Sequence, residues 1–383
     1  MSSSHGRLRL YLPKTVYEES LNRIRYLFDE FEEVIVSFSG GKDSTVIFNL
    51  ALIVAREKQR LPLKVLFLDQ EAELLSTIDT VRQVMHHPDV YPLWYQIPFK
   101  LFNATSTVDH WLHCWNPDDE ARWMRPKEPD ALTENKYGTD RFVDLLVKIM
   151  GVDFKDRKAC YLSGIRCEES PRRTLGMTEH LTYKHITWGL KISARHFSFS
   201  PIYDWSFIDV WKAIHDNGWS YNRHYDFMYR YGVSRSKMRV SSLNHETSIP
   251  MLFMLQEIEP ETYERMTARI SGIYTAAKMN FDDYFPKRLP FMFKSWVEYR
   301  DHLLKHLITD PAWTKSFTRR FQKQDVIYGS MGETLTKVQI KSILTNDWEG
   351  VVGYDNFRVL KTPTKLRKAY RAAQQAKTQA ETP

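Results

Sequence analysis

The spacing of apolar positions divides the first part of the chain into alternating helices and strands. Apolar residues recur at helical spacing over residues 14–31 and again over residues 44–57, and both runs predict amphipathic helices. Residues 34–38 and 63–68 are continuous apolar runs of the length that a buried strand needs. Strand, helix and strand in this order predict a βαβ unit, and such a unit implies a parallel sheet.

The same pattern continues downstream with less regular spacing. We expect a helix over residues 141–150, a strand over 159–165, another strand over 199–203, and a helix over 207–217. Gly218 is a natural stop for the last of these helices. The sequence therefore predicts an α/β fold in which helices flank a parallel sheet.

Two further segments set the expected domain organisation. Residues 88–137 are rich in Pro, Trp and charged residues and have weak periodicity, so we expect an irregular insertion or lid there. Residues 361–383 are basic and predict a frayed helix or tail. We therefore expect a domain over residues 1–245 that contains the insertion, and a mostly helical, basic region over residues 246–383. Helical spacing in that region covers residues 251–257, 261–270 and 296–307.

Composition and charge indicate the kind of ligand and the compartment. A hydrophobic content of 43% in 383 residues supports a substantial core. The 54 basic residues exceed the 47 acidic ones, and a net charge of +7 suits polyanions such as nucleotides or nucleic acid without requiring them. The chain has three cysteines, no run of about 20 apolar residues, and no signal-type apolar core at its N-terminus. These features favour a cytoplasmic protein.

The segment Ser39-Gly40-Gly41-Lys42-Asp43-Ser44 lies between the first predicted strand and the next helix. Two adjacent glycines bring bare backbone amides close to a ligand, and the helix adds its first unpaired N–H groups. Ser39, Ser44 and Thr45 add hydroxyl donors, Lys42 adds a cation, and Asp43 offers a contact to Mg²⁺. A generic glycine turn capped by Ser44 is the plainer interpretation. The position at the carboxyl end of a parallel strand favours phosphate binding.

This segment is not a Walker A loop. That motif needs a glycine five residues before the Gly-Lys pair and Ser or Thr directly after the lysine. Val36 occupies the first position and Asp43 the second. The absence of this motif therefore argues against a kinase or GTPase of the Walker A type.

Three segments further along the chain add candidate ligand contacts: the turn after the second strand, residues 163–173 and residues 221–239. Asp69 follows the second strand, where its carboxylate can reach a ribose hydroxyl or Mg²⁺ and where the backbone of Phe67 can read an adenine edge. Glu71 and Glu73 fit a solvated acidic turn equally well.

The block over residues 163–173 holds Gly164 for close approach, and Arg166, Arg172 and Arg173 as forked donors for phosphate or sulfate. Its alternative is a surface salt-bridge cluster. In residues 221–239 basic and aromatic residues alternate. This pattern is typical of segments that bind phosphates and unstacked bases, and it fits equally well aromatic side chains packed in a core with basic residues at its surface.

The loop sequence resembles the PP-loop of the ATP pyrophosphatase superfamily, which includes the phosphoadenosine-phosphosulfate (PAPS) reductases and has the adenine nucleotide alpha hydrolase-like fold. The order of the blocks over residues 14–275, including the patch at 114–118, is similar to the YbdN/IbrA-like branch. The resemblance implies that the loop holds the β- and γ-phosphates of ATP while the α-phosphate is transferred as an adenylate. It implies ATP and Mg²⁺ as ligands. The implied nucleotide-binding residues are Ser39, Gly40, Gly41, Lys42, Asp43, Ser44, Thr45, Phe67, Asp69 and Gly164, with Asp43 and Asp69 on the metal and Lys42, Asp43, Arg166 and Arg173 in catalysis.

The sequence departs from the reductases of this superfamily in its cysteines. The resemblance to PAPS reductases implies a nucleophilic cysteine near the C-terminus, because those enzymes use one. No cysteine follows Cys167 in this sequence. Three scattered cysteines do not supply the four thiolates of an iron–sulfur cluster. Cys160 and Cys167 stay open as persulfide carriers, against the plainer view that small buried cysteines are inert packing.

Three functional hypotheses follow from these features. The leading one is an ATP pyrophosphatase that adenylates an acceptor for sulfur transfer. The acceptor would be DNA, as in the DndC- and SspD-type phosphorothioation enzymes that work with a cysteine desulfurase. The second is sulfate activation of the ATP sulfurylase kind. The third is a nucleotide-sensing regulator with a ParB-like partner, similar to what is proposed for IbrA-like proteins.

Overall fold

The computed structural model describes residues 12–106, 109–169, 171–178, 181–235, 238–240, 243, 249–274 and 288–347. The chain forms two compact units. The first comprises residues 1–99 and 114–241, and the second comprises residues 100–113 and 242–383. The predicted basic tail over residues 361–383 lies outside the described residues.

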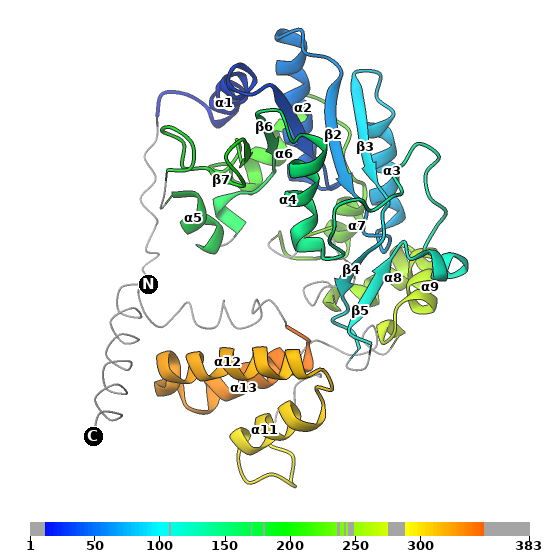
Figure 1. Ribbon diagram of the computed structural model, residues 1–383, viewed down its shortest axis with the longest axis vertical. Coiled ribbons are helices and arrows are strands. Elements are labelled where there is room, and N and C mark those ends of the chain that lie inside the picture. Colours follow the sequence, from blue (N-terminus) through cyan, green and yellow to red (C-terminus); the bar gives the residue numbers. More distant parts are fainter. Residues whose placement is uncertain are drawn as a thin grey trace. The chain divides into compact units, whose positions relative to one another are not determined.

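The first unit contains a six-stranded sheet whose strand order is β3-β2-β1-β6-β8-β7. The neighbouring strands β2 and β3 lie side by side in Figure 1. Neighbouring strands are parallel except β7 and β8, which are antiparallel. In the centre of the sheet, Ile35 of β1 lies opposite Lys64 of β2 and Tyr161 of β6. The strands span Glu33–Ser37 (β1), Leu63–Leu68 (β2), Val90–Tyr95 (β3), Ala159–Leu162 (β6), Gly189–Lys191 (β7) and His196–Phe199 (β8).

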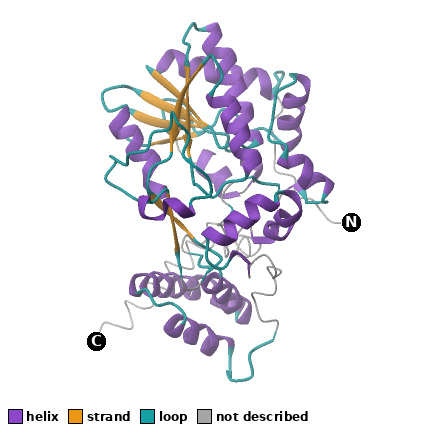
Figure 2. Ribbon diagram, turned by 90° about the vertical axis from the view of Figure 1, so that its right-hand side faces the viewer, coloured by secondary structure: helices purple, strands orange, loops and turns teal. Residues whose placement is uncertain are grey.

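Helices cover both faces of this sheet (Figure 2). The predicted α/β fold with a mainly parallel, helix-flanked sheet is thereby confirmed. The first helix begins with a capping box, in which Thr15 Oγ1 accepts from Glu18 N at 3.2 Å and Thr15 N donates to the Glu18 carboxylate at 2.9 Å. The helices of this unit are α1 (Val16–Glu30), α2 (Lys42–Glu57), α3 (Leu75–Met85), α4 (Phe142–Asp153), α5 (Pro171–Thr178), α6 (Phe207–Asp216) and α7 (His224–Arg230).

The core of the first unit joins α1 and α2 to the sheet. Ile24 of α1, Val36 of β1 and Leu50 of α2 are fully buried members of one cluster. Burial of each such side chain contributes about 1.5–3 kcal/mol. These contacts hold the amino end of α2 at the edge of the sheet where β1 ends.

Two predicted segments differ from the structure. Residues 88–137, expected as an irregular insertion, contain the edge strand β3, the pair β4 (Phe99–Phe102) and β5 (Trp111–Cys114), and the 3-10 helix η1 (Pro117–Arg122). Pro92 interrupts the apolar pattern of β3, and an edge strand tolerates a proline because one side of its ladder is free. The strand expected at 199–203 ends earlier, at Phe199, and the chain then turns as Tyr203 N donates to Ser200 O at 3.0 Å.

The second unit is mostly helical, as the apolar spacing predicts. Trp313, Phe317 and Phe321 recur every four residues on α12, so they share one face and form the centre of its core. Segment 100–113 belongs to this unit, and Asn346 Nδ2 donates to Asn103 O at 3.1 Å. None of the helices in the described part of the chain has the length and apolar character needed to cross a membrane. The helices are α8 (Ile249–Ile258), α9 (Pro260–Arg269), α11 (Trp296–His306), α12 (Pro311–Tyr328), η4 (Gly329–Met331) and α13 (Glu333–Leu344).

Candidate functional site

The candidate site lies where the strand order of the sheet reverses. The chain runs from β1 to β2 and β3 on one side, while β6 and β8 lie on the other side of β1. The loops that follow β1 and β6 therefore leave the same edge as neighbours, which is the position where open parallel sheets bind ligands. Gly164, after β6, touches the first turn of α2, which directly follows the loop after β1. A Cβ atom added to it would lie 2.8 Å from the carbonyl carbon of Asp43 and 2.9 Å from Ser44 N.

The glycine pair makes a tight turn that other elements hold in place. Gly40 has a φ of 67°, a left-handed conformation that glycine adopts without strain. A Cβ atom on Gly40 would lie 2.7 Å from Cγ2 of Thr77 on α3. Asn222 Nδ2 donates to Gly40 O at 3.3 Å and to Thr77 Oγ1 at 2.9 Å. Gly41 is the N-cap of α2 and supplies no side-chain cap, and the first amide of the helix, Lys42 N, donates to the hydroxyl oxygen of Tyr225 at 3.2 Å.

A short chain of charges crosses from this loop to the one after β6. Lys42 Nζ lies 2.7 Å from Asp43 Oδ2, and Arg166 Nε lies 2.6 Å from Asp43 Oδ1. Arg166 Nη1 also lies 3.0 Å from Glu168 Oε2. The side chains of Lys42 and Arg166 are only 6% and 3% exposed. Burial lowers the pKa of Lys42 below its ordinary value, and the charge of Asp43 opposes that shift.

These charges face a pocket of about 340 Å³ in the first unit. Arg173 pairs with Glu169 beside it, and its pKa is lowered by burial and then by the positive charge of Arg239. A cluster of cations that depress one another's pKa is stabilised by an added anion. The charged side chains that line the pocket are Lys42, Arg166, Arg235, Arg239, Glu168 and Glu169.

The structure places two predicted hydroxyl contacts inside the helix turn. Ser44 Oγ donates to Gly41 O at 2.9 Å and accepts from Ser39 N at 3.2 Å. Thr45 Oγ1 donates to Gly41 O at 3.0 Å, and Thr45 is buried. In this arrangement both side chains stabilise the turn. The side chain of Phe67 packs edge-on against Trp94, and its backbone lies within the β2–β3 ladder.

Asp69 does not lie among the charges of the pocket. Its Oδ2 accepts from Trp94 Nε1 at 2.8 Å and from Gln96 Nε2 at 2.9 Å, and it pairs with Arg125. Its Oδ1 accepts from Glu71 N at 2.9 Å, and the side chain has no exposed surface. Each oxygen of this carboxylate already accepts from a buried donor, and no part of the side chain is open to a ligand. The expected role of Asp69 on a ribose or a metal does not fit this geometry.

The carboxylates do not form a ready-made magnesium site. Both oxygens of Asp43 are paired with cations, and those of Asp69 are committed to buried donors. Across the ranges that the structure describes, no group of three or more His, Cys, Asp or Glu residues is arranged to hold a metal ion. The residues present therefore do not fit Mg²⁺ held by Asp43 and Asp69 together.

The acidic turn after β2 is buried, so the solvated turn that the sequence left open as one alternative for Glu71 and Glu73 is wrong. Glu71 has a φ of 61°, and its carboxylate accepts from Trp115 N at 2.7 Å. Trp115 itself has a φ of 54°. The patch at 114–118 thus anchors the turn, and sequence spacing gives no sign of this because the partners lie 44 residues apart.

Cys114 and Cys160 offer little support for a sulfur relay, whereas Cys167 is only half-buried and stays open as a candidate. Cys160 is fully buried in β6, and burial raises the pKa of its thiol well above the ordinary value. A thiol with a raised pKa is a poor nucleophile at neutral pH. Cys114 is also buried, and its Sγ lies 3.2 Å from Gln70 O.

Sequence reasoning missed Asn222, Thr77 and Tyr225 as supports of the loop. Asn222 and Tyr225 fall in the basic and aromatic block over residues 221–239, but their roles follow only from contacts with a loop about 180 residues earlier. The side chain of Arg172, expected beside Arg173, lies outside the described residues.

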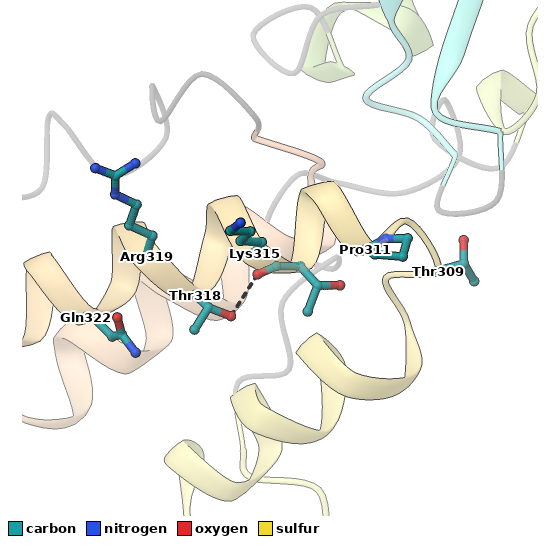
Figure 3. Close-up of a pocket in the computed structure, with 7 residues that line it drawn as sticks. Thr309, Pro311, Lys315, Thr318, Arg319 and Gln322 are labelled. Atoms are coloured by element: carbon teal, nitrogen blue, oxygen red, sulfur yellow. Dashed lines mark hydrogen bonds between the residues drawn. The ribbon is translucent and has the colours of Figure 1, made fainter.

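A second hollow, of about 660 Å³, lies on the second unit along α12. Figure 3 shows Lys315 and Arg319 one helical turn apart on this helix, with Thr318 bonded to the preceding turn. Lys315, Arg319 and Lys323 are exposed, and within the described ranges none of them makes a salt bridge. This surface, which we call the α12 basic face, is open and suits an extended anion better than a small enclosed ligand.

Comparison with known proteins assigns the family. Residues 33–231 match the family model described as the phosphoadenosine phosphosulfate reductase domain, which is more than half of the chain. The chain belongs to this family of PP-loop nucleotide-binding proteins, as the loop sequence predicts. Residues 232–382 match a domain of unknown function, DUF3440.

Among individual proteins, the chain is similar to the uncharacterized protein YbdN of Escherichia coli K12, with 26% identity over 324 residues, covering 81% of this chain and 79% of YbdN. This agrees with the predicted YbdN/IbrA-like branch.

Solved structures show weaker similarity. The FMN adenylyltransferase of Candida glabrata has 12% identity and a TM-score of 0.35, covering 56% of this chain and 62% of that enzyme. The PAPS reductase of Candida auris, in a phosphate complex, has 13% identity and a TM-score of 0.30, covering 58% of this chain and 94% of that one.

Proposed function

We propose that this protein splits ATP into pyrophosphate and an adenylyl group at the loop of residues 39–44, and passes the adenylyl group to an acceptor oxygen. The observation that carries the proposal is the buried pair Lys42 and Arg166, held on opposite oxygens of Asp43 at the mouth of a basic pocket. Membership of a PP-loop nucleotide-binding family supports it.

The chemistry needs stabilisation of negative charge on the leaving group. The acceptor oxygen, which is already ionised in a phosphodiester or in sulfate, attacks the α-phosphorus, the bond to the bridging oxygen breaks, and pyrophosphate leaves with that electron pair. Preorganised cations stabilise this developing charge, because they are already desolvated and need no rearrangement. Lys42 and Arg166 would act on pyrophosphate, and Arg173 would add positive charge from the side of α5.

Asp43 has a different role in this proposal from the metal contact that the sequence suggests. Its two oxygens position Lys42 and Arg166, and removal of the carboxylate would leave two buried cations facing each other. We assign no metal-dependent step to Asp43 or Asp69, since their oxygens are already paired.

Reduction of a sulfonucleotide does not form part of the proposal. No cysteine follows Cys167 in the sequence, and Cys160 is a buried thiol with a raised pKa. Sulfur, where it enters, would come from a partner such as a cysteine desulfurase and displace AMP from the adenylated acceptor.

The α12 basic face favours a nucleic acid as that acceptor. Lys315, Arg319 and Lys323 recur every four residues on one stripe of α12, and such unpaired cations match the repeating phosphates of a nucleic-acid backbone. DNA phosphorothioation is the specific form of this proposal. Sulfate activation is the alternative, and the arginines of the pocket, Arg166, Arg235 and Arg239, are what supports it.

The test is pyrophosphate release from ATP, measured without acceptor, with sulfate, and with single- or double-stranded DNA. We expect DNA to stimulate release and Lys42→Ala to reduce it by about 100-fold or more. The matched control is Lys58→Ala at the far end of α2, where the lysine pairs with Asp29 on the surface and should not affect release.

The alternatives have distinct outcomes in the same assay. Stimulation by sulfate alone would replace DNA modification with sulfate activation. Nucleotide binding without release under any condition would contradict the enzyme and favour a sensing regulator with a partner such as a ParB-like protein. If DNA is the acceptor, Lys315→Ala combined with Arg319→Ala should weaken its effect and reduce the salt dependence.

A further inference from the structure

Tyr225 connects the helix α7 to the loop after β1. Its side chain is 3% exposed, and Lys42 N donates to its hydroxyl oxygen at 3.2 Å. A Cβ atom added to Gly41 would lie 3.4 Å from the same hydroxyl oxygen. The hydroxyl therefore lies directly over the turn at which the glycine pair enters α2.

The hydrogen-bonding capacity of this hydroxyl is only half used. A phenol oxygen accepts from one donor and gives its own proton to an acceptor. The oxygen accepts from Lys42 N, while no described residue accepts the Tyr225 proton. Buried donors are nearly always paired with protein, water or ligand, and an unpaired one costs about 1–3 kcal/mol.

The surroundings of the hydroxyl favour an anion as the missing acceptor. Lys42 Nζ lies 5.5 Å from the centre of the Tyr225 ring, and Arg166 and Arg239 act on Tyr225 electrostatically. Burial, and then the charge of Asp43, raise the pKa of Tyr225 above its ordinary value. The hydroxyl thus keeps its proton at physiological pH and is available as a donor.

The ring is fixed by packing that does not involve the hydroxyl. Trp211 of α6 meets the Tyr225 ring edge-on, with ring centres 5.4 Å apart. Asn222, in the turn before α7, accepts from His224 N and donates to Gly40 O. These contacts hold the hydroxyl against the loop, so its position is set before any ligand binds.

We infer that Tyr225 is a phosphate-binding residue of this site, and that its hydroxyl donates to an oxygen of a pyrophosphate group held at the Gly41–Lys42 turn. The ligand class is inorganic pyrophosphate or the terminal phosphates of a nucleoside triphosphate. The choice of ligand rests on the proposed function, whereas the unpaired hydroxyl proton of Tyr225 follows from the contacts in the structure alone. The competing reading is that the hydroxyl serves only as a cap for the first amide of α2.

Tyr225→Phe tests the inference because it removes one oxygen and keeps the ring. Binding of inorganic pyrophosphate and of AMP to the full-length protein is measured by calorimetry. We expect pyrophosphate affinity to fall about tenfold or more, as for loss of a hydrogen bond to a charged group, with AMP affinity unchanged. The matched control is Tyr137→Phe, a buried tyrosine whose hydroxyl donates to Asp153 at 2.8 Å, and it should leave pyrophosphate affinity unchanged.

A purely structural role gives a different result. If Tyr225→Phe lowers the melting temperature but binds pyrophosphate as the wild type does, the hydroxyl is a helix cap and the inference is overturned. If the variant does not fold, a crystal structure of the wild type with pyrophosphate decides. A Tyr225 oxygen within about 3 Å of a phosphate oxygen supports the inference, and a phosphate bound elsewhere overturns it.

The inference and the proposed function fail separately. A wild type that binds pyrophosphate through Tyr225 but never splits ATP would refute the proposed activity and leave the phosphate site standing. A wild type that splits ATP while Tyr225→Phe retains full pyrophosphate affinity would refute the phosphate-binding role alone.

Discussion

Gly164 lies against the first turn of α2, where there is no space for a side chain. A Cβ atom there would lie 2.8–2.9 Å from backbone atoms of Asp43 and Ser44, and backbone does not yield as a flexible side chain does. The residue therefore sets how closely Arg166 approaches Asp43. Its role could be proposed from sequence as a site of close approach, but the neighbour it approaches could not.

Gly164→Ala should displace the loop after β1. We expect pyrophosphate release to fall about tenfold or more, because a shift of about 1 Å at a reacting centre costs up to about 100-fold in rate. The control is Gly151→Ala in α4, where an added Cβ meets no atom within 4 Å and stability should rise by about 0.5–1 kcal/mol. Full activity in Gly164→Ala would show that the loop contact does not position the site.

At the scale of elements, the turn between β2 and α3 contains the buried carboxyl group of Glu73. Glu73 is 4% exposed, and within the described residues its Oε2 has no hydrogen-bond partner. Burial, and then the charge of Asp69, raise the pKa of Glu73 to about 8, while Arg125 acts in the opposite direction. The group is therefore neutral in the folded protein at pH 7, although it is ionised in the unfolded chain.

The raised pKa of Glu73 determines whether the stability of the folded protein rises or falls with pH. Because the folded pKa lies above the ordinary value of 4.5, the contribution of Glu73 to stability is fully present below that value and is lost as the pH rises through about 8. Glu73→Gln should abolish this loss and be more stable than the wild type by about 1–3 kcal/mol at high pH. Urea unfolding across the pH range checks it, with exposed Glu134→Gln as control. An identical pH dependence in wild type and variant would contradict the prediction.

At the scale of the whole molecule, the two units carry separate cores. The charged residues that line the pocket all belong to the first unit, whereas Phe317 is fully buried in the core of the second. Phe317→Ala should destabilise the second unit by about 3–5 kcal/mol and leave pyrophosphate affinity unchanged. Phe291→Ala, at a side chain that is 97% exposed, is the control and should change neither property. Thermal unfolding and calorimetry measure the two properties. A parallel loss of pyrophosphate binding would show that the pocket depends on the second unit.

Local patterns in the sequence were sufficient for the elements around the loop. The helices α1, α2 and α6 and the strands β1 and β2 lie within a few residues of their predicted ranges, because periodicity over one element reflects which face is buried. The edge strand β3 was missed because Pro92 breaks that periodicity, and a proline at an edge costs the sheet little. The family assignment confirms the resemblance that the loop sequence carries.

What the sequence by itself determined is a glycine turn between a buried strand and a helix, with Lys42 and Asp43 at the start of that helix. These features depend on neighbours along the chain, so spacing is enough to find them. Only the tertiary structure decided which distant groups complete the site: Arg166 reaches Asp43 across 123 residues, and Tyr225 reaches Lys42 across 183. The same holds for Asp69, whose carboxylate accepts from Trp94 and Gln96 at the end of β3 and so lies apart from the charges of the pocket. Partners, burial and pKa arise from packing between segments, which no local periodicity encodes.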